Sequence, residues 1–177
     1  MQICQWISGI LVGGGLLAGS VRADIPVTIT ATIVEPTCSV TEINGGSQAV
    51  VDFGVVDLLS VNTAQAQKPL QMKVSCGGAA STGKTLKMQV SAGGHGTMTY
   101  GGENVLGTTV TGLGIKLTDK GGASVIPGTW YPVAGVDITQ PTPAGNVILT
   151  AALVSANPAA LTVGGITSSA TVVMAYM

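Results

Sequence analysis

The stretch from Gly78 to Thr85 comes nearest, in residue types and spacing, to a chemical motif. It matches G-x-x-x-x-G-K-[ST], the phosphate-binding loop of many nucleotide-binding proteins. That loop works because a following helix directs its N-terminal amides at the phosphates. Here Leu86 to Ser91 alternate between apolar and polar side chains, which predicts a strand instead. We therefore interpret the stretch as a Gly- and Ser-rich turn between two strands.

The other reactive side chains form no recognisable catalytic pattern. His95 is alone between two glycines, which favours a solvated loop residue over a catalytic one. No serine occupies a Gly-x-Ser-x-Gly turn, and the acidic residues are scattered along the chain. Trp130 and Tyr131 could stack on a sugar, but packing in a core is the favoured interpretation. We expect no enzyme, no cofactor and no metal site.

Composition points to a β-rich protein. Of 177 residues, 46% are hydrophobic, 8% are charged and 26 are Gly, a mixture that favours strands joined by Gly-rich turns. The formal net charge is -1, which gives no electrostatic footprint for nucleic acid or for an anionic membrane.

The first 23 residues are expected to be a cleaved secretory signal. Ile7 to Ala18 is an apolar run too short for a stable membrane anchor, and Val21-Arg22-Ala23 resembles a signal-peptidase site. The residues before the run include no Lys or Arg, which is atypical, and a retained apolar segment is the alternative. Export would leave Cys38 and Cys76, since Cys4 departs with the signal.

Two cysteines in an exported chain are expected to form a disulfide. Two buried free thiols are the alternative. A zinc site is disfavoured, because Cys38, Cys76 and the distant His95 do not supply four ligands at a suitable spacing.

Alternating and β-branched segments predict a β-sandwich. The connections are Gly-rich, as at 93–102, and a turn or two of helix is conceivable near 56–66. The expected strands are 24–34, 38–43, 69–76, 85–91, 105–110, 113–118, 130–133, 147–154 and 170–177.

The last strand poses a problem of exposure. It has no Gly, Pro or charge, and Ala170, Val172, Met174 and Tyr176 share one face. An apolar strand needs neighbours on both edges, because an open edge favours aggregation. No later residue supplies one, which leaves open what covers this strand.

Taken in order, these features resemble the subunits of chaperone–usher pili, the type 1 and P fimbrial pilin family. An alternating segment, Ile25 to Ile33, lies five residues before the first Cys of the pair, although Ala31 stands where the family usually has Gly. Val51 to Val55 is similar to the family's hydrophobic-x-Phe-Gly segment. Tyr176 is penultimate, and Gly164 stands fourteen residues from the end, as in the family. Cys38 and Cys76 match its single disulfide, which links the first two strands.

The resemblance implies an all-β fold, an incomplete immunoglobulin-like sandwich that lacks its last strand and has a free N-terminal donor strand. Residues 24–35 would be the donor extension and residues 36–177 the pilin domain. The implied donor side chains are Ile25, Val27, Ile29, Ala31 and Ile33. The implied acceptor and chaperone-binding residues are Gly164, Ala170, Val172, Met174 and Tyr176.

The implied function is that of a structural subunit of an extracellular bacterial fimbria that supports adhesion. The expected partners are a periplasmic chaperone, an outer-membrane usher and neighbouring pilin subunits, with no nucleic acid; a host-surface receptor would be met through the assembled pilus. The chain would pass through the periplasm on its way to the bacterial surface. The alternative is a minor, tip-type subunit with glycan or host-surface binding of its own.

Overall fold

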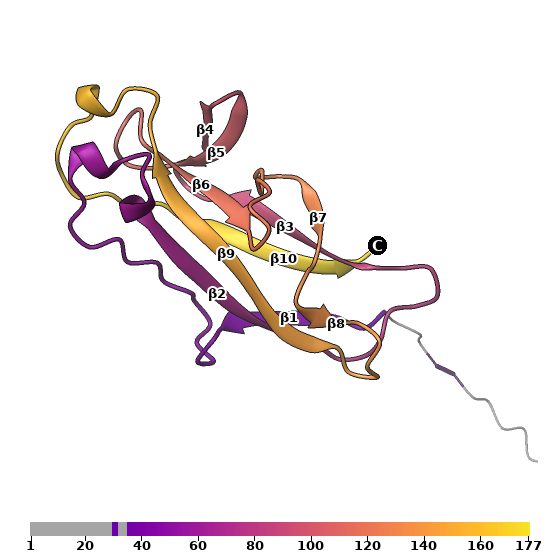
Figure 1. Ribbon diagram of the computed structural model, residues 1–177. Helices are drawn as coiled ribbons and strands as arrows, with labels where there is room; N and C mark the ends of the chain where they lie inside the picture. The colour runs from indigo at the N-terminus through magenta and orange to yellow at the C-terminus, as the bar shows by residue number, and fades with distance from the viewer. Residues whose placement is uncertain (1–29, 32–34) are drawn as a thin grey trace, which may run out of the picture. The chain divides into compact units, whose positions relative to one another are not determined.

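The computed structural model describes residues 30–31 and 35–177, and residues 35–177 form two antiparallel sheets packed face to face (Figure 1). The larger sheet has the strand order β1-β2-β9-β6-β5-β4, with β8 paired to β9. Its strands are β1 (Cys38–Glu42), β2 (Gln67–Cys76), β4 (Thr97–Tyr100), β5 (Glu103–Gly107), β6 (Gly114–Asp119), β8 (Val136–Asp137) and β9 (Ala144–Val154). The smaller sheet has the order β10-β3-β7, with β3 (Leu86–Ala92), β7 (Trp130–Pro132) and β10 (Ala170–Tyr176). The predicted immunoglobulin-like sandwich is confirmed.

Alternating side chains build the core between the sheets. On β2, Met72, Val74 and Cys76 are buried while the residues between them are exposed. On β3 the buried residues are Leu86, Met88 and Val90, as the alternation predicted. Both sets belong to one buried cluster that also contains Leu149 and Met174. The period of two therefore places one face of each strand in the core.

A smaller apolar cluster closes one end of the sandwich. Its buried members are Val61, Ala66, Leu113, Leu153 and Leu161. Three single-turn 3-10 helices surround it: η1 (Leu58–Ser60), η2 (Ala64–Ala66) and η3 (Pro158–Ala160). The first two lie where a turn or two of helix was considered. In Figure 1 the η helices lie at the end of the sandwich opposite the C-terminus.

Two strands were not predicted, and glycines explain both. Residues 93–102 were expected to be a turn region, but β4 and β5 form a hairpin around Gly101 and Gly102. Both glycines have positive φ (59° and 83°), as a two-residue hairpin turn requires. At β8, a Cβ on Gly145 would collide with the carbonyl oxygen of Gly135, so only glycine allows the two backbones to approach.

Several predicted features lie outside the described residues. They are the signal segment 1–23 and the donor residues Ile25, Val27, Ile29 and Ile33. Ala31 is described, and it is exposed and in no regular element. Residues 34–177 form a compact unit of their own. Where the structure describes the chain, no helix is long and apolar enough to cross a membrane.

Candidate functional site

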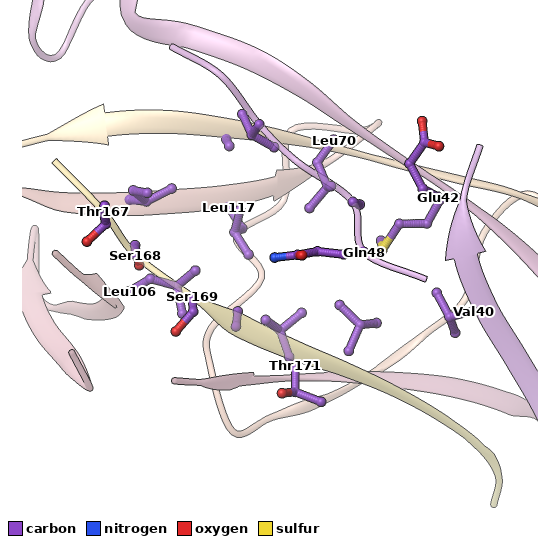
Figure 2. Close-up of a pocket in the computed structure, with 18 of the residues that line it drawn as sticks. Val40, Glu42, Gln48, Leu70, Leu106, Leu117, Thr167, Ser168, Ser169 and Thr171 are labelled. Atoms are coloured by element: carbon purple, nitrogen blue, oxygen red, sulfur yellow. The ribbon is translucent and has the colours of Figure 1, made fainter. Parts of the chain in front are cut away.

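A groove of about 560 Å³ opens between the two sheets, along β10 (Figure 2). One side is formed by β1 and the extended segment 47–53 that follows it. The other side is formed by residues 166–172, which lead into and begin β10. Both β1 and β10 are edge strands of their sheets and contact each other. The groove therefore lies at the seam where one side of the sandwich is open.

The floor of the groove is the hydrophobic core itself. Met72, Val90, Leu106, Leu117 and Ala151 line it, and each is buried among core residues. The rim is polar and comes from Thr167, Ser168, Ser169 and Thr171 on one side, with Ser47 and Gln48 on the other. Figure 2 shows Gln48 projecting into the groove toward Leu117. An apolar floor with a hydrogen-bonding rim suits an extended peptide better than a small polar metabolite.

The backbone of β10 offers one free edge to the groove. Met177 and Thr85, the residue before β3, donate a backbone hydrogen bond to each other. At the other end of the pair, the Gly93 amide donates to the Ser169 carbonyl oxygen. Because antiparallel pairs alternate, the odd-numbered residues of β10 direct their N–H and C=O groups at β3. The groups of Ala170, Val172, Met174 and Tyr176 then point away from β3. Within residues 35–177, no strand pairs with that edge.

The opposite side of the groove also lacks backbone partners. Residues 47–53 belong to no strand, and no backbone–backbone hydrogen bond within the described part of the chain involves them. Their side chains still anchor the segment, since Ala49, Val51 and Phe53 pack against the main core. An inserted strand would thus find unpaired peptide groups on both sides. Unpaired peptide groups of this kind are what β-strand addition uses.

The structure separates the predicted acceptor residues into three groups. Ala170 and Val172 line the groove. Met174 and Tyr176 are buried, with exposed fractions of 8% and 7%, and are not among the residues that line it. Gly164 is exposed in the connection between η3 and β10, with φ of 159°. The even-numbered residues therefore share a face as predicted, but only the first half of β10 borders the groove.

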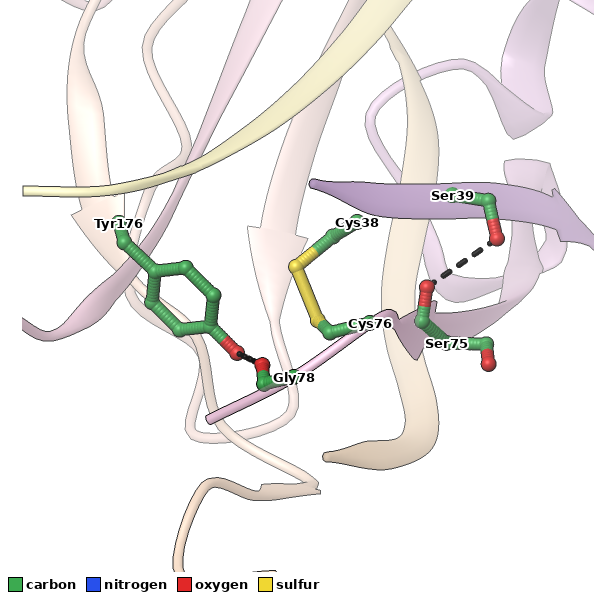
Figure 3. Close-up of a disulfide and its surroundings, with 6 residues drawn as sticks. All are labelled: Cys38, Ser39, Ser75, Cys76, Gly78 and Tyr176. Atoms are coloured by element: carbon green, nitrogen blue, oxygen red, sulfur yellow. Dashed lines mark hydrogen bonds between the residues drawn. A yellow bond between two sulfur atoms is a disulfide. The ribbon is translucent and has the colours of Figure 1, made fainter. Parts of the chain in front are cut away.

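A disulfide and Tyr176 close the other end of the sandwich (Figure 3). Cys38 and Cys76 are opposite each other in the β1–β2 register and are joined by a disulfide with an Sγ–Sγ distance of 2.08 Å. The Tyr176 hydroxyl donates a 3.0 Å hydrogen bond to the Gly78 carbonyl oxygen, just beyond Cys76. Burial raises the pKa of Tyr176 above its ordinary value. The C-terminal half of β10 is thereby fixed to the start of the domain.

The motif-like residues lie elsewhere and perform structural roles. Gly78 to Thr85 leads into strand β3, so no helix follows the loop. His95 is exposed in the turn before β4. Tyr131 packs against the core and its hydroxyl accepts a 3.0 Å hydrogen bond from the Ile126 amide, while Trp130 is half-buried. Within the described ranges, no three His, Cys, Asp or Glu side chains gather where a metal ion could bind.

Charge contributes little to the groove. Glu42 is the one ionisable residue that lines it. The Glu103 carboxylate, at the start of β5, does not line the groove; the Ser124 hydroxyl and Lys116 lower its pKa. Its oxygen is 3.2 Å from the Lys116 ammonium, at the surface. Because the groove carries almost no charge, apolar contact and backbone pairing must supply most of any binding there.

The polar rim at Thr167 to Ser169 was not predicted from the sequence. Its position depends on contacts with distant parts of the chain: the Ser168 hydroxyl donates to the Gly107 carbonyl oxygen over 2.7 Å, and the Thr109 amide donates to the Thr167 carbonyl oxygen. Gly93 permits the closest approach, because a Cβ there would collide with Ser169. No local pattern marks such a rim. In the sequence, the Gly93–Gly94 pair was the one sign that two backbones approach closely beside this rim.

Comparison with known proteins gives a consistent result. A family model described as "Fimbrial protein" matches residues 27–177. The minor fimbrial protein PrsF of Escherichia coli is 30% identical over 109 residues, which cover 62% of this chain and 60% of PrsF. The match thus spans less than two-thirds of that relative.

Solved structures share the fold. The P pilus rod subunit PapA superposes with a TM-score of 0.53 at 20% identity, over 86% of this chain and all of PapA. The P pilus adaptor subunit PapF superposes with a TM-score of 0.50 at 23% identity, over 82% of this chain and all of PapF. A chain from a solved chaperone–usher pilus superposes with a TM-score of 0.54 at 18% identity, over 90% of this chain and all of that one. At these identities the likeness concerns the fold.

Proposed function

Because this chain belongs to the family of fimbrial proteins, we propose that it is a pilus subunit that polymerises by exchanging a β-strand with its neighbour. The observation that carries the proposal is the free edge of β10 beside an apolar groove. In this account the groove accepts residues 24–35 of another subunit. The inserted segment would pair its backbone with β10 and with 47–53, and its apolar side chains would cover the floor.

The donor sequence suits such a groove. Ile25, Val27, Ile29, Ala31 and Ile33 would all point to one side of an extended strand. Each larger side chain would contribute about 1.5 kcal/mol or more on burial. Net affinity would be smaller, since a free segment loses conformational entropy when it orders. Once inserted, the strand would leave slowly, because its departure exposes the whole core-lined groove.

Before assembly the groove needs a temporary occupant. We propose that a periplasmic chaperone supplies a strand along β10 and that an outer-membrane usher then replaces it with the donor strand of the next subunit. This order requires residues 1–23 to direct export and to be removed. Ala170 and Val172 would contact the inserted strand directly, whereas Met174 and Tyr176 would hold β10 in place from the core side.

The alternative of a minor subunit is not specifically favoured, since the minor fimbrial protein PrsF is similar in sequence and the rod subunit PapA shares the fold. Glycan binding at Trp130 and Tyr131 has less support, because Tyr131 packs against the core.

Complementation by a peptide tests the proposed function. A synthetic peptide with the sequence of residues 24–35 is added to the purified mature chain, residues 24–177. We expect the chain alone to oligomerise or to unfold at low denaturant, and the peptide to raise its unfolding midpoint and release monomers. The control peptide replaces Ile29 with Asp, which leaves the length unchanged but places a charge against the apolar floor. A mature chain that stays monomeric and fully stable without any donor would refute the proposal.

A further inference from the structure

An apolar patch is exposed where the small cluster closes the sandwich. Val55, Leu59 and Val163, here called the end patch, have exposed fractions of 104%, 88% and 78%. Their neighbours in sequence point inward: Val56, Leu58 and Leu161 belong to the small cluster or pack against it. The end patch is thus the outer layer of that cluster. Exposed apolar side chains that are grouped around one cluster commonly mark an interaction surface on a soluble protein.

The end patch is held on a well-anchored scaffold. Asn62, just after η1, has φ of 68°, the one positive value at a non-glycine residue of the described chain. Its side chain donates to the Ser155 carbonyl oxygen (2.8 Å) and accepts from the Ser155 amide (2.9 Å). The backbone amide of Asn62 also donates to the carbonyl oxygen of Leu153 on β9. Because η1 is fixed to β9 in this way, and η1 lies against η3, the patch is presented in one arrangement.

The end patch adjoins one end of the groove. Phe53 and Ile166 line the groove and also pack against the small cluster beneath the patch. Phe53 lies two residues before Val55, and Ile166 lies three residues after Val163. A strand that leaves the groove at this end therefore passes directly onto the end patch.

The start of the domain lies at the opposite pole. Cys38 begins β1 beside Cys76, and Tyr176 ends β10 near Gly78. Lys84 forms an ion pair with Glu35, which holds the entering chain at this pole. Four residues, 34–37, separate the donor residue Ile33 from Cys38, and an extended chain of that length spans roughly 17 Å. A neighbour that donates its strand must therefore seat this pole close to the end of the groove where Ile33 emerges.

We propose that the end patch is the seat of the neighbouring subunit's disulfide pole, chiefly its loop 77–84. This inference rests on the proposed function and adds a second interface to it. The side chains of this loop are short and almost uncharged, since only Gly, Ala, Ser and Thr precede Lys84. The loop can therefore approach an apolar surface closely. Contact between two different surfaces of identical or similar subunits does not close on itself, and so it builds a filament.

The proposal fixes the direction of the donor strand. Ile33 must emerge at the 166–170 end, so the donor runs antiparallel to β10. Every strand pair in residues 35–177 is antiparallel, and antiparallel pairing is slightly the more stable kind. A parallel donor would instead bring the neighbour to the Tyr176 end and leave Val55, Leu59 and Val163 in water.

Photo-crosslinking in oligomers of the mature chain, residues 24–177, tests this arrangement. Benzoylphenylalanine is placed at Leu59 in one variant, at Gln48 in the groove in a second, and at Ile148 on the outer face of β9 as a control. Equal amounts of ¹⁴N- and ¹⁵N-labelled chain are mixed before irradiation, so that mass spectrometry separates links between copies from links within one. We expect position 59 to link to residues 77–84 of another copy and position 48 to link to residues 24–35.

The two positions distinguish the two claims. Links from position 48 to residues 24–35, with links from position 59 absent or located outside residues 77–84, would overturn the end-patch interface and leave strand exchange standing. If the oligomers give no link from position 48 to residues 24–35, strand exchange fails and the end-patch proposal fails with it. Position 148 should link to neither segment, and equal linking from positions 148 and 59 would also overturn the interface.

Discussion

The hydroxyl of Tyr176 donates a 3.0 Å hydrogen bond to the carbonyl oxygen of Gly78, and this bond joins the last strand to the loop that follows Cys76. It lies beside the Cys38–Cys76 disulfide, so the end of β10 and the start of β1 are fixed at the same pole (Figure 3). The open groove begins only beyond Met174, toward Val172 and Ala170. The side chains of β10 are therefore buried in the core in its second half and border the groove in its first half.

Substitution of Tyr176 should separate its packing from its hydrogen bond. Tyr176→Ala should lower the free energy of unfolding by about 3–5 kcal/mol, as a large buried ring is lost. Tyr176→Phe keeps the ring and should cost only about 1 kcal/mol, the usual size of one hydrogen bond. Urea unfolding with the donor peptide present measures both values. Equal losses for the two variants would mean that the ring does not pack as described.

Alkaline pH should weaken the same contact. Burial raises the folded-state pKa of Tyr176 above the value of about 10 that the unfolded chain has. The stabilisation is therefore complete below about pH 10 and is lost as pH rises through the folded-state pKa. The difference in unfolding free energy between wild type and Tyr176→Phe should shrink between pH 9 and pH 11. A difference that stays constant over that range would contradict this origin of the pKa shift.

Reduction of the disulfide should destabilise the domain strongly. Cys38 and Cys76 are 38 residues apart, and closing a loop of that length restricts the unfolded chain by about 4 kcal/mol in the chain-entropy model. The double variant Cys38→Ser, Cys76→Ser should lose a similar amount in urea unfolding. Wild type measured with and without reductant provides the matched comparison. A loss below about 1 kcal/mol in both experiments would show that the bond does not restrict the unfolded chain in this way.

Two adjacent glycines allow a controlled test of the groove's rim. A Cβ at Gly93 would collide with Ser169, whereas a Cβ at Gly94 would meet nothing within 4 Å. Gly93→Ala should therefore push the start of β10 away from β3 and cost about 1–3 kcal/mol. Gly94→Ala should change stability by less than about 0.5 kcal/mol. Donor-peptide affinity, measured by calorimetry, should fall with Gly93→Ala alone; equal affinities would exclude this role for the Gly93–Ser169 contact.

Sequence periodicity was enough to predict most of the strands, though not β4 or β8, and the shared face of β10. Leu86, Met88 and Val90 are buried as predicted, because a strand on a core alternates with a period of two. Gly101 and Gly102 predict a flexible turn region, but two adjacent glycines equally fit the tight turn of the β4–β5 hairpin. That misreading shows how weakly a Gly-rich stretch distinguishes a loop from a hairpin.

The extent of the groove was not predictable from local pattern. Whether Met174 faces a groove or a core depends on what the opposite sheet places against it, and the sequence of β10 does not encode that. The rim at Thr167 to Ser169 depends on contacts with Gly93, Gly107 and Thr109, all more than fifty residues away. Long-range approach of this kind leaves no signal in a single segment. The two halves of β10 could therefore be distinguished only in three dimensions.

Hydrogen exchange along β10 tests the central claim most directly. The mature chain is measured with and without the peptide of residues 24–35, and amides are resolved individually by NMR. We predict strong new protection at Ala170 and Val172, whose amides point to the free edge, and at residues 47–53. The amides of Thr171 and Val173 already pair with β3, so their protection should change much less. Unchanged exchange at Ala170 and Val172 in the presence of saturating peptide would contradict strand insertion at this groove.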